Sequence, residues 1–161
     1  MNIKVVFPAL MILMLTQALT SCGTKEAEYD WPCWRGPNGD GISLDTDWDP
    51  EALSGGAKIL WKTNIGIGYS NVAIEDGLLY TMGSESRTTS VICLNAQTGK
   101  EVWRYAIGPG LESQSIPAVD GARVYGLDNR GALVCLKAKN GKVIWKTHLK
   151  DDLNARKTST G

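Results

Sequence analysis

After residue 20, the hydrophobic residues occur in short stretches that are separated by turn residues. Pairs such as Asp76-Gly77 and Asn140-Gly141 stand between the stretches, and such pairs are typical of tight turns between strands. No stretch has the three-to-four-residue apolar spacing of an amphipathic helix. The expected strands are 71–75, 78–82, 90–95 and 101–107, followed by 115–119, 123–127, 132–137 and 142–149. The pattern therefore predicts an all-β protein.

The strand pattern repeats along the chain. Trp61, Trp103 and Trp145 are spaced 42 residues apart. Two other pairs repeat at this distance, namely Cys93 with Cys135 and Gly99 with Gly141. A period of about 40 to 45 residues with four short strands in each unit is typical of β-propeller blades. We therefore expect about two four-stranded blades, together with one additional strand over 57–66.

The N-terminal segment has the pattern of an export signal. Residues 5–15 form an almost unbroken apolar run of eleven residues, whereas a membrane-spanning helix needs roughly 20. The run leads to Leu19-Thr20-Ser21-Cys22, which resembles the lipobox of bacterial lipoproteins. The resemblance implies cleavage before Cys22 and a lipid on its thiol. The alternative is an ordinary secretory signal with a chance cysteine. Gly23 in place of the aspartate that retains some lipoproteins at the inner membrane favours the outer membrane.

The order of these segments predicts how the chain is organised. Residues 1–21 are assigned to the signal peptide, 22–30 to a tether, 31–56 to an N-terminal strap, and 57–161 to propeller blades. A closed propeller has about 4 to 8 blades. We therefore expect this sequence to be part of a protein with seven or eight blades. The alternative is a short protein that closes its ring by forming oligomers.

Two segments carry a family resemblance. Residues 93–103 and 135–145 resemble the tryptophan-docking motif of pyrroloquinoline-quinone (PQQ) type propellers, and residues 31–41 resemble the start of PQQ-like propeller proteins, many of which are lipoproteins. Cysteine stands at the alanine position of both motifs. The aspartate position holds Asn95 in one motif and Lys137 in the other. The bond that this aspartate makes in the family is therefore in question.

The resemblance implies a structural role for the repeated residues. In the family, each motif tryptophan stacks on the first residue of its own motif and on a glycine peptide of the neighbouring blade. Trp103 would accordingly rest on Cys93 and on the Gly141 peptide, and Trp61 on the Gly99 peptide. A flat indole requires a small neighbour and bare backbone at such a place.

Composition narrows the function. Seventeen basic and seventeen acidic residues give zero net charge, which excludes a broadly basic nucleic-acid-binding protein. The sequence has no vicinal Cys-Cys pair and no residue that matches the calcium ligands or the catalytic aspartate of PQQ alcohol dehydrogenases. We expect a non-catalytic binding or assembly scaffold of the bacterial envelope, without a cofactor, with the membrane and other envelope proteins as partners. The alternative is the N-terminal part of a periplasmic PQQ-dependent dehydrogenase, whose cofactor would depend on further blades.

Other residues with reactive side chains have simpler interpretations. Cys33 between two tryptophans is either a reactive or disulfide-bonded thiol or a variable position of the strap, and we favour the latter. The acidic residues between 45 and 51 lack the glycine and terminal glutamate of a calcium loop and indicate a solvated loop. Cys93 and Cys135 are expected to pack in the interior, and His148 is expected at the surface or a strand edge.

Overall fold

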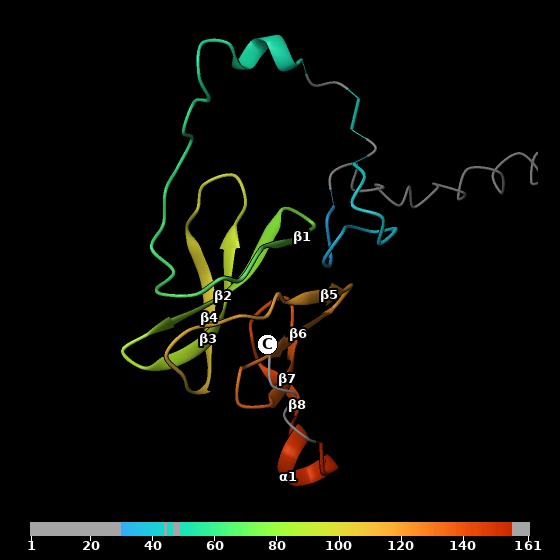
Figure 1. Cartoon of the computed structure of the whole chain (residues 1–161), viewed down its shortest axis with the longest axis vertical. Coiled ribbons are helices and arrows are strands. Elements are labelled where there is room, and N and C mark those ends of the chain that lie inside the picture. The colour runs from blue at the N-terminus through green and yellow to red at the C-terminus, as the bar shows by residue number, and fades with distance from the viewer. Residues whose placement is uncertain (1–29, 44, 47–48, 156–161) are drawn as a thin grey trace, which may run out of the picture.

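The computed structural model describes residues 30–43, 45–46 and 49–155, and this part of the chain contains two four-stranded antiparallel sheets (Figure 1). The order of strands in each sheet follows the sequence. The first sheet consists of β1 (Ala73–Glu75), β2 (Leu78–Glu85), β3 (Thr88–Asn95) and β4 (Glu101–Pro109). The second consists of β5 (Ala118–Asp120), β6 (Arg123–Leu127), β7 (Ala132–Lys137) and β8 (Val143–His148). The two predicted sheets are confirmed.

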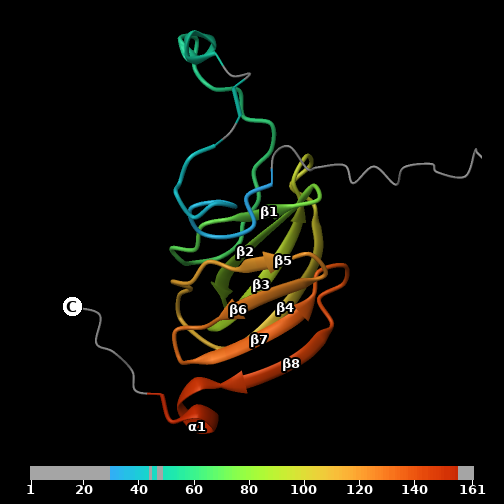
Figure 2. The same cartoon turned by 90° about the vertical axis from the view of Figure 1, so that its right-hand side faces the viewer.

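The main core lies between the two sheets, which stack face to face (Figure 2). Tyr80, Met82 and Val91 of the first sheet pack in one cluster with Val124 and Leu136 of the second, and all five side chains are at most 1% exposed. Alternate residues of each strand point to opposite faces. One face of each sheet is therefore buried against the other sheet.

The opposite face of the first sheet is covered by the segment that precedes it. Trp61 and Ile65 pack against Ile92 and Leu94 in a second cluster. Strand β3 is consequently buried on both faces, and Val91, Ile92, Cys93 and Leu94 are all at most 2% exposed. This accounts for the continuous apolar run in β3, which has no hydrophobic–polar alternation.

The additional strand expected over 57–66 is not formed. This segment lies on a face of the first sheet and contributes side chains, whereas a strand needs a partner for its backbone. Among the described residues, none pairs with 57–66 in a β-ladder; the nearest bridge lies just after this segment, between Ile67 and Ser84. The apolar pattern of this segment therefore reflects packing without strand pairing.

The hairpin between β2 and β3 is longer than predicted. The sequence placed the strand ends at 82 and 90, but pairing continues to Glu85 and Thr88. Ser86 and Arg87 have φ angles of 49° and 62° and form the two-residue turn between them. Two successive left-handed residues match the twist of a hairpin. Neither residue is a glycine or an asparagine, so the turn carried no clear signal in the sequence.

Other strand boundaries also shift. Strand β1 begins two residues later than predicted, and β5 begins at Ala118, after Pro117, three residues later than predicted. Strand β8 ends at His148, and the short helix α1 (Leu149–Leu153) follows it. The Asp152 carboxylate accepts hydrogen bonds from the backbone of His148 at 2.7 Å and from the hydroxyl of Thr147 at 2.9 Å. These bonds lower the pKa of Asp152 and fold the chain back at the end of the strand.

The described residues of the predicted strap, 31–43, 45–46 and 49–56, contact both sheets and include the 3-10 helix η1 (Pro50–Leu53). Trp31 exchanges two backbone hydrogen bonds with Ile74 of β1, at 2.8 and 2.9 Å, and the carbonyl of Pro32 accepts one from Val119 of β5 at 2.8 Å. The strap therefore contacts the first strand of each sheet. Within the described ranges, no helix is long and apolar enough to cross a membrane.

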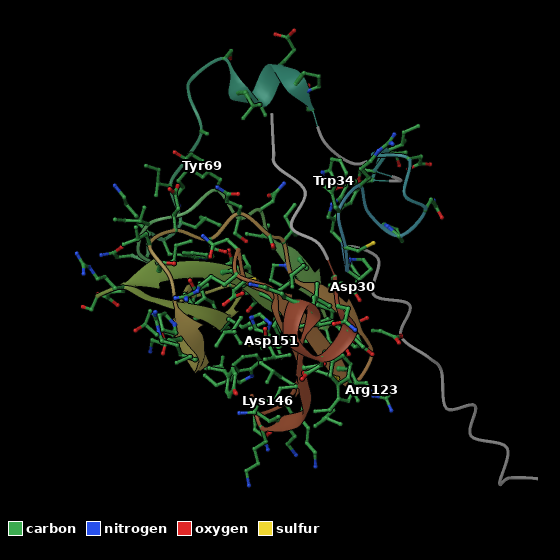
Figure 3. The ribbon with its side chains drawn as sticks, turned by 60° about the horizontal axis from the view of Figure 1, so that its bottom comes forward. Asp30, Trp34, Tyr69, Arg123, Lys146 and Asp151 are labelled. Atoms are coloured by element: carbon green, nitrogen blue, oxygen red, sulfur yellow. The ribbon has the colours of Figure 1, made fainter. Side chains whose placement is uncertain are left out.

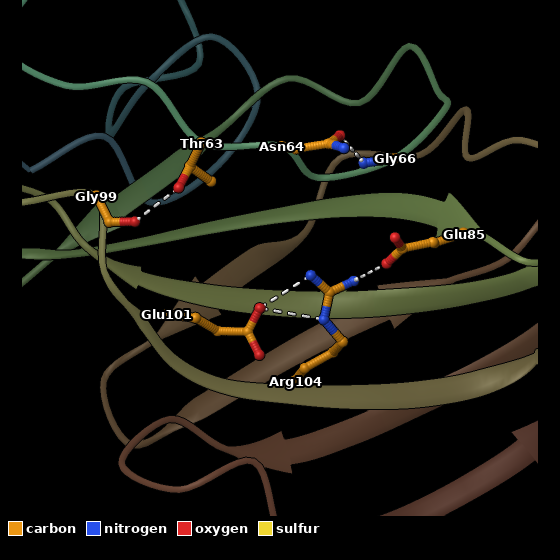
Figure 4. Close-up of polar contacts among 7 residues, drawn as sticks. All are labelled: Thr63, Asn64, Gly66, Glu85, Gly99, Glu101 and Arg104. Carbon is orange, nitrogen blue, oxygen red and sulfur yellow. Dashed lines mark hydrogen bonds and ion pairs between the residues drawn. The ribbon is translucent and has the colours of Figure 1, made fainter.

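Polar contacts connect separate strands at the surface (Figure 4). The Arg104 guanidinium of β4 donates two hydrogen bonds to Glu101, at 2.9 and 3.1 Å, and lies 3.8 Å from Glu85 of β2. Exposed pairs of this kind contribute little to stability. The sheets are held together mainly by their apolar faces.

Candidate functional site

Trp103 lies in the interface between the sheets, against a bare turn of the second sheet. A Cβ atom at Gly141 would come within 2.7 Å of the Trp103 ring. The indole Nε1 of Trp103 donates a hydrogen bond to the carbonyl of Ala138 at 2.8 Å, and the side chain is only 9% exposed. Gly141 has a φ of 67°, which favours glycine independently of the ring. The structure therefore brings together the two residues that the motif pairs.

Trp61 repeats this arrangement on the other face of the first sheet. A Cβ atom at Gly99 would collide with the Trp61 ring. The indole Nε1 donates to the carbonyl of Ala96 at 3.0 Å, and the Thr63 hydroxyl donates to the carbonyl of Gly99 at 3.0 Å (Figure 4). The same contact thus recurs at two successive interfaces.

A cysteine and a tyrosine lie beside Trp103 on the same face of the first sheet. Tyr80, Cys93 and Trp103 are direct neighbours in the strand register, and the two rings are 6.0 Å apart with an angle of 49° between them. Burial raises the pKa of the Cys93 thiol to about 12 and also raises the pKa of Tyr80. Cys93 is therefore a protonated packing residue at neutral pH and a poor nucleophile.

The second sheet carries the same row of residues on its other face. Tyr125, Cys135 and Trp145 are aligned in the register, and the rings are 6.1 Å apart with an angle of 50° between them. Trp145, however, is 42% exposed, and Val143 beside it is 41% exposed. Within the described part of the chain, no glycine backbone covers the Trp145 ring and no carbonyl accepts a hydrogen bond from its indole.

A second repeated contact escaped the sequence analysis. The Glu75 carboxylate accepts a long hydrogen bond, 3.4 Å, from the backbone of Gly121 in the turn before β6. The Asp30 carboxylate likewise accepts one of 3.1 Å from Asp76 in the turn before β2. Burial is the main cause that raises the pKa of both carboxyls. Each acid precedes the residue that donates to it by 46 residues, and this shared offset is the signal by which the two pairs could have been found in the sequence.

A shallow, open cavity lies between loops of the two sheets. Arg87 from the β2–β3 turn and Arg130 from the β6–β7 turn line it, together with Glu112 from the connection between the sheets. The two arginines are exposed and come from equivalent turns of the repeat. Their charges suit an anionic group, such as a carboxylate of a protein partner.

The other residues singled out in the sequence make local polar contacts with nearby residues. Cys33 is half-buried, and its thiol lies 3.2 Å from the carbonyl of Gly36. His148 is half-buried and lies 3.2 Å from the Asp151 carboxylate. The Asn95 side chain accepts hydrogen bonds from the Thr98 backbone and hydroxyl, at 2.9 and 2.8 Å; asparagine therefore provides the acceptor that was in question at the aspartate position.

Two further predictions concern sites that the structure tests only in part. Cys22, the predicted site of lipidation, lies outside the described residues, as does Asp47 of the acidic stretch. Asp45 and Asp49 are exposed, and Asp49 caps η1. The described residues contain no cluster of three or more potential metal ligands.

Comparison with known proteins identifies the repeat. Residues 87–158 match the family model described as outer membrane protein assembly factor BamB. No curated protein matches the sequence significantly. Among solved structures, quinohemoprotein alcohol dehydrogenase from Comamonas testosteroni is similar over 76% of this chain and 20% of its own, with 21% identity and a TM-score of 0.58. BamB from Moraxella catarrhalis is similar over 58% of this chain and 28% of its own, with 24% identity and a TM-score of 0.49.

These comparisons confirm the predicted fold and the recognition of PQQ-like propeller repeats. The two sheets correspond to blades of a partial β-propeller. The chain spans less than a third of the length of either solved protein. The likeness to the dehydrogenase, at 21% identity, concerns the fold alone.

Proposed function

We propose that this chain of PQQ-like propeller repeats is a non-catalytic scaffold of the bacterial envelope that supports the assembly of outer-membrane proteins. The observation that carries the proposal is the match of residues 87–158 to the family described as an outer membrane protein assembly factor. The matched segment includes Trp103, Cys135 and Trp145. A shared fold does not by itself determine function, so the further support must come from the chain itself.

The chemistry of the described motif residues supports a binding role. Trp61 and Trp103 have their indole nitrogens bonded to backbone carbonyls, and Cys93 is buried with a pKa raised to about 12. Each of these groups stabilises the interface between layers. The cavity between Arg87 and Arg130 offers a place where the loops of both sheets contact an acidic surface of another envelope protein.

The proposal includes the cellular location of the protein, which is held at a membrane by a lipid. Acylation of Cys22 would hold the chain at a membrane, and Gly23 after it favours the outer membrane. More than one acyl chain gives durable anchoring, whereas a single chain is marginal. We expect radioactive palmitate to label the wild-type chain and not the Cys22→Ser variant. Continued labelling of that variant would refute the lipid anchor.

Loss of the gene tests the assembly role directly. In the source bacterium, deletion should lower the amount of folded, heat-modifiable barrel proteins in the outer membrane, and the wild-type sequence should restore it. The double variant Arg87→Ala, Arg130→Ala should restore it less well, because the proposed contact loses both cations. Arg35→Ala, which removes another exposed arginine outside the cavity, serves as the control. Unchanged barrel proteins after deletion would contradict the assembly role.

The alternative function is part of a PQQ-dependent dehydrogenase. It is kept because residues 93–103 and 135–145 resemble the tryptophan-docking motif that these dehydrogenases share. Titration with PQQ and calcium, followed by an assay of dye-linked alcohol oxidation, separates the two functions. We expect neither saturable binding nor oxidation. Stoichiometric binding of PQQ by this chain would favour the dehydrogenase instead.

A further inference from the structure

We propose that the cavity between loops of the two sheets binds an extended polypeptide segment that carries an acidic side chain beside an apolar one. This loop cavity is lined by the β2–β3 turn, by residues 109–112 of the connection between the sheets, and by the β6–β7 turn. The inference rests on the proposed function in taking a protein as the partner. It adds the chemistry that this partner must present.

The two arginines of the loop cavity have guanidinium groups without a partner among the described residues. Arg87 and Arg130 are exposed, and neither side chain forms a hydrogen bond or an ion pair there. The Arg104 guanidinium, in contrast, is bound to Glu101. Glu112 also lines the cavity, so two cations face one carboxylate and the described lining keeps one excess positive charge. An acidic group of a partner would balance this charge.

The turn that carries Arg87 is held in a strained conformation. Ser86 and Arg87 have φ angles of 49° and 62°, a region that glycine adopts much more readily than other residues. The Arg87 carbonyl accepts a hydrogen bond of 2.9 Å from Gly110. A Cβ atom at Gly110 would collide with the buried side chain of Thr89, so the connection lies close against this hairpin. Backbone strain of this kind is found mainly where a side chain must be held in place for function.

The turn that carries Arg130 is also fixed by hydrogen bonds. The Asp128 carboxylate accepts one from the backbone of Arg130 at 2.9 Å and one from the backbone of Ala132 at 2.8 Å. Asp128 is only 5% exposed. The Gly131 carbonyl accepts a further bond from the backbone of Leu149 in α1 at 2.8 Å. Both cations therefore stand on backbone that is ordered before a partner arrives, which lowers the entropy cost of binding.

The shape of the loop cavity favours a peptide over a small molecule. Its volume is about 500 Å³, which lies within the range of about 300–1,000 Å³ for ligand sites. It is open, however, whereas a small ligand is usually enclosed on most of its surface. Pro109 and Leu111 form an apolar part of the lining, and Leu111 is 67% exposed. An extended chain can lie along such an open cavity and contact both the apolar part and the arginines.

Two polar residues of the lining also suit a peptide. The half-buried Glu112 would repel a multiply charged anion such as phosphate, but its carboxylate can accept a hydrogen bond from a backbone N–H. The Asn129 amide can both donate and accept, as pairing with a peptide group requires. On an extended chain, residues two positions apart project to the same side. A segment with an acidic residue two positions from an apolar one therefore matches the arginines and Leu111.

Fluorescence anisotropy with a defined peptide tests the site. The probe is Ser-Leu-Thr-Glu-Thr-Leu-Ser with an amidated C-terminus and an uncharged fluorophore, so that the glutamate carries its only carboxylate. A leucine lies two positions from the glutamate on either side, which makes the direction of binding unimportant. The full chain should bind this peptide saturably. Glutamine in place of the glutamate, or serine in place of both leucines, should weaken binding at least about threefold. Sodium chloride at about 500 mM should also weaken it, because salt screens exposed charges.

Variants of the two arginines locate the binding. The double variant Arg87→Ala, Arg130→Ala should bind the peptide about tenfold more weakly than the wild type. Arg123→Ala is the matched control, because Arg123 is exposed and begins β6, whereas the loop cavity lies beyond the end of that strand. Figure 3 shows Arg123 far from Tyr69, whose backbone N–H donates to Ser113 in the connection. The control should bind the peptide like the wild type.

Arg87→Gly separates binding from folding. Glycine adopts the left-handed conformation without strain, so this variant should unfold at a higher urea concentration than the wild type and yet bind the peptide less well. If Arg87 served the fold alone, the variant would be less stable. A lower urea midpoint, or binding as tight as that of the wild type, would overturn the role given to this turn.

The remaining outcomes decide the proposal as a whole. Absence of saturable binding, equal binding of the glutamine peptide, or unchanged binding by the double variant would overturn it. Displacement of the peptide by an equal concentration of inorganic phosphate would overturn it too, in favour of a simple anion site. The assembly role is tested separately. If gene deletion lowers the barrel proteins but the peptide does not bind, this inference alone fails. If the peptide binds and deletion has no effect, the proposed function alone fails.

Discussion

Replacement of Trp103 by alanine should destabilise the protein strongly, because this side chain connects the two sheets. The indole is 9% exposed, packs against Gly141, and donates a hydrogen bond to Ala138. Its removal leaves a cavity between two layers that cannot collapse without moving a whole sheet. It also leaves the Ala138 carbonyl without its indole donor.

The magnitude follows from the buried area. A tryptophan buries about 200 Å², which at about 25 cal/mol per Å² corresponds to about 5 kcal/mol. Alanine retains part of this burial, so a loss of about 3–5 kcal/mol is expected. Trp145, which is 42% exposed, should lose about two thirds as much from burial. The missing hydrogen bond should add about 1 kcal/mol to the difference between the two variants.

Chemical denaturation is the appropriate assay. Urea unfolding followed by far-ultraviolet circular dichroism gives the free energy of unfolding for the wild type, Trp103→Ala and Trp145→Ala. The order of stability should be wild type, then Trp145→Ala, then Trp103→Ala. A loss below about 1 kcal/mol for Trp103→Ala would mean that the indole does not hold the sheets together.

Three further predictions concern the same interface and its thiols. Gly141→Ala should destabilise the fold more than Gly77→Ala in urea unfolding, because both glycines have positive φ but only at Gly141 would the new Cβ meet an indole; equal losses would contradict the ring contact. Burial raises the pKa of Glu75, so the folded state binds its proton more tightly than the unfolded state and loses stability as the pH rises through the normal and raised values. Glu75→Gln should therefore raise the melting temperature at pH 7 and change it little at pH 3, whereas a lower melting temperature at pH 7 would show that the charge stabilises the fold. Among the cysteines of the described residues, a thiol reagent should label Cys33 first and Cys93 only on unfolding, since Cys93 is fully buried; rapid labelling of Cys93 itself, located by peptide mass spectrometry in the native protein, would refute this.

The sequence predicted the fold best at positions where packing or backbone geometry allows only a few residue types. The 42-residue spacing of the tryptophans and glycines predicted the two sheets, because a flat ring on bare backbone restricts both partners to few residue types. Strands β6 and β7 formed at the predicted residues. Their limits are set by apolar runs and by turns that contain glycine.

The sequence was less informative where pairing depends on distant neighbours. The apolar residues of 57–66 fit a strand as well as they fit a packed, unpaired segment, and only the position of the first sheet decides between the two. The turn at Ser86-Arg87 lacks a glycine, so its left-handed conformation was not evident. The contacts of Asp30 and Glu75 escaped notice because their acceptors are ordinary acids and their donors are backbone groups.

The strap also sets the order of events during synthesis. The Pro32 carbonyl bonds to Val119, which is made 87 residues later. At about 5–20 residues per second, the N-terminal segment would wait about 4–17 s before this partner exists. Strands β1 to β4 pair with near neighbours and can form in that interval. The bond between the strap and β5 would therefore form only after the strands of the first sheet have been able to pair.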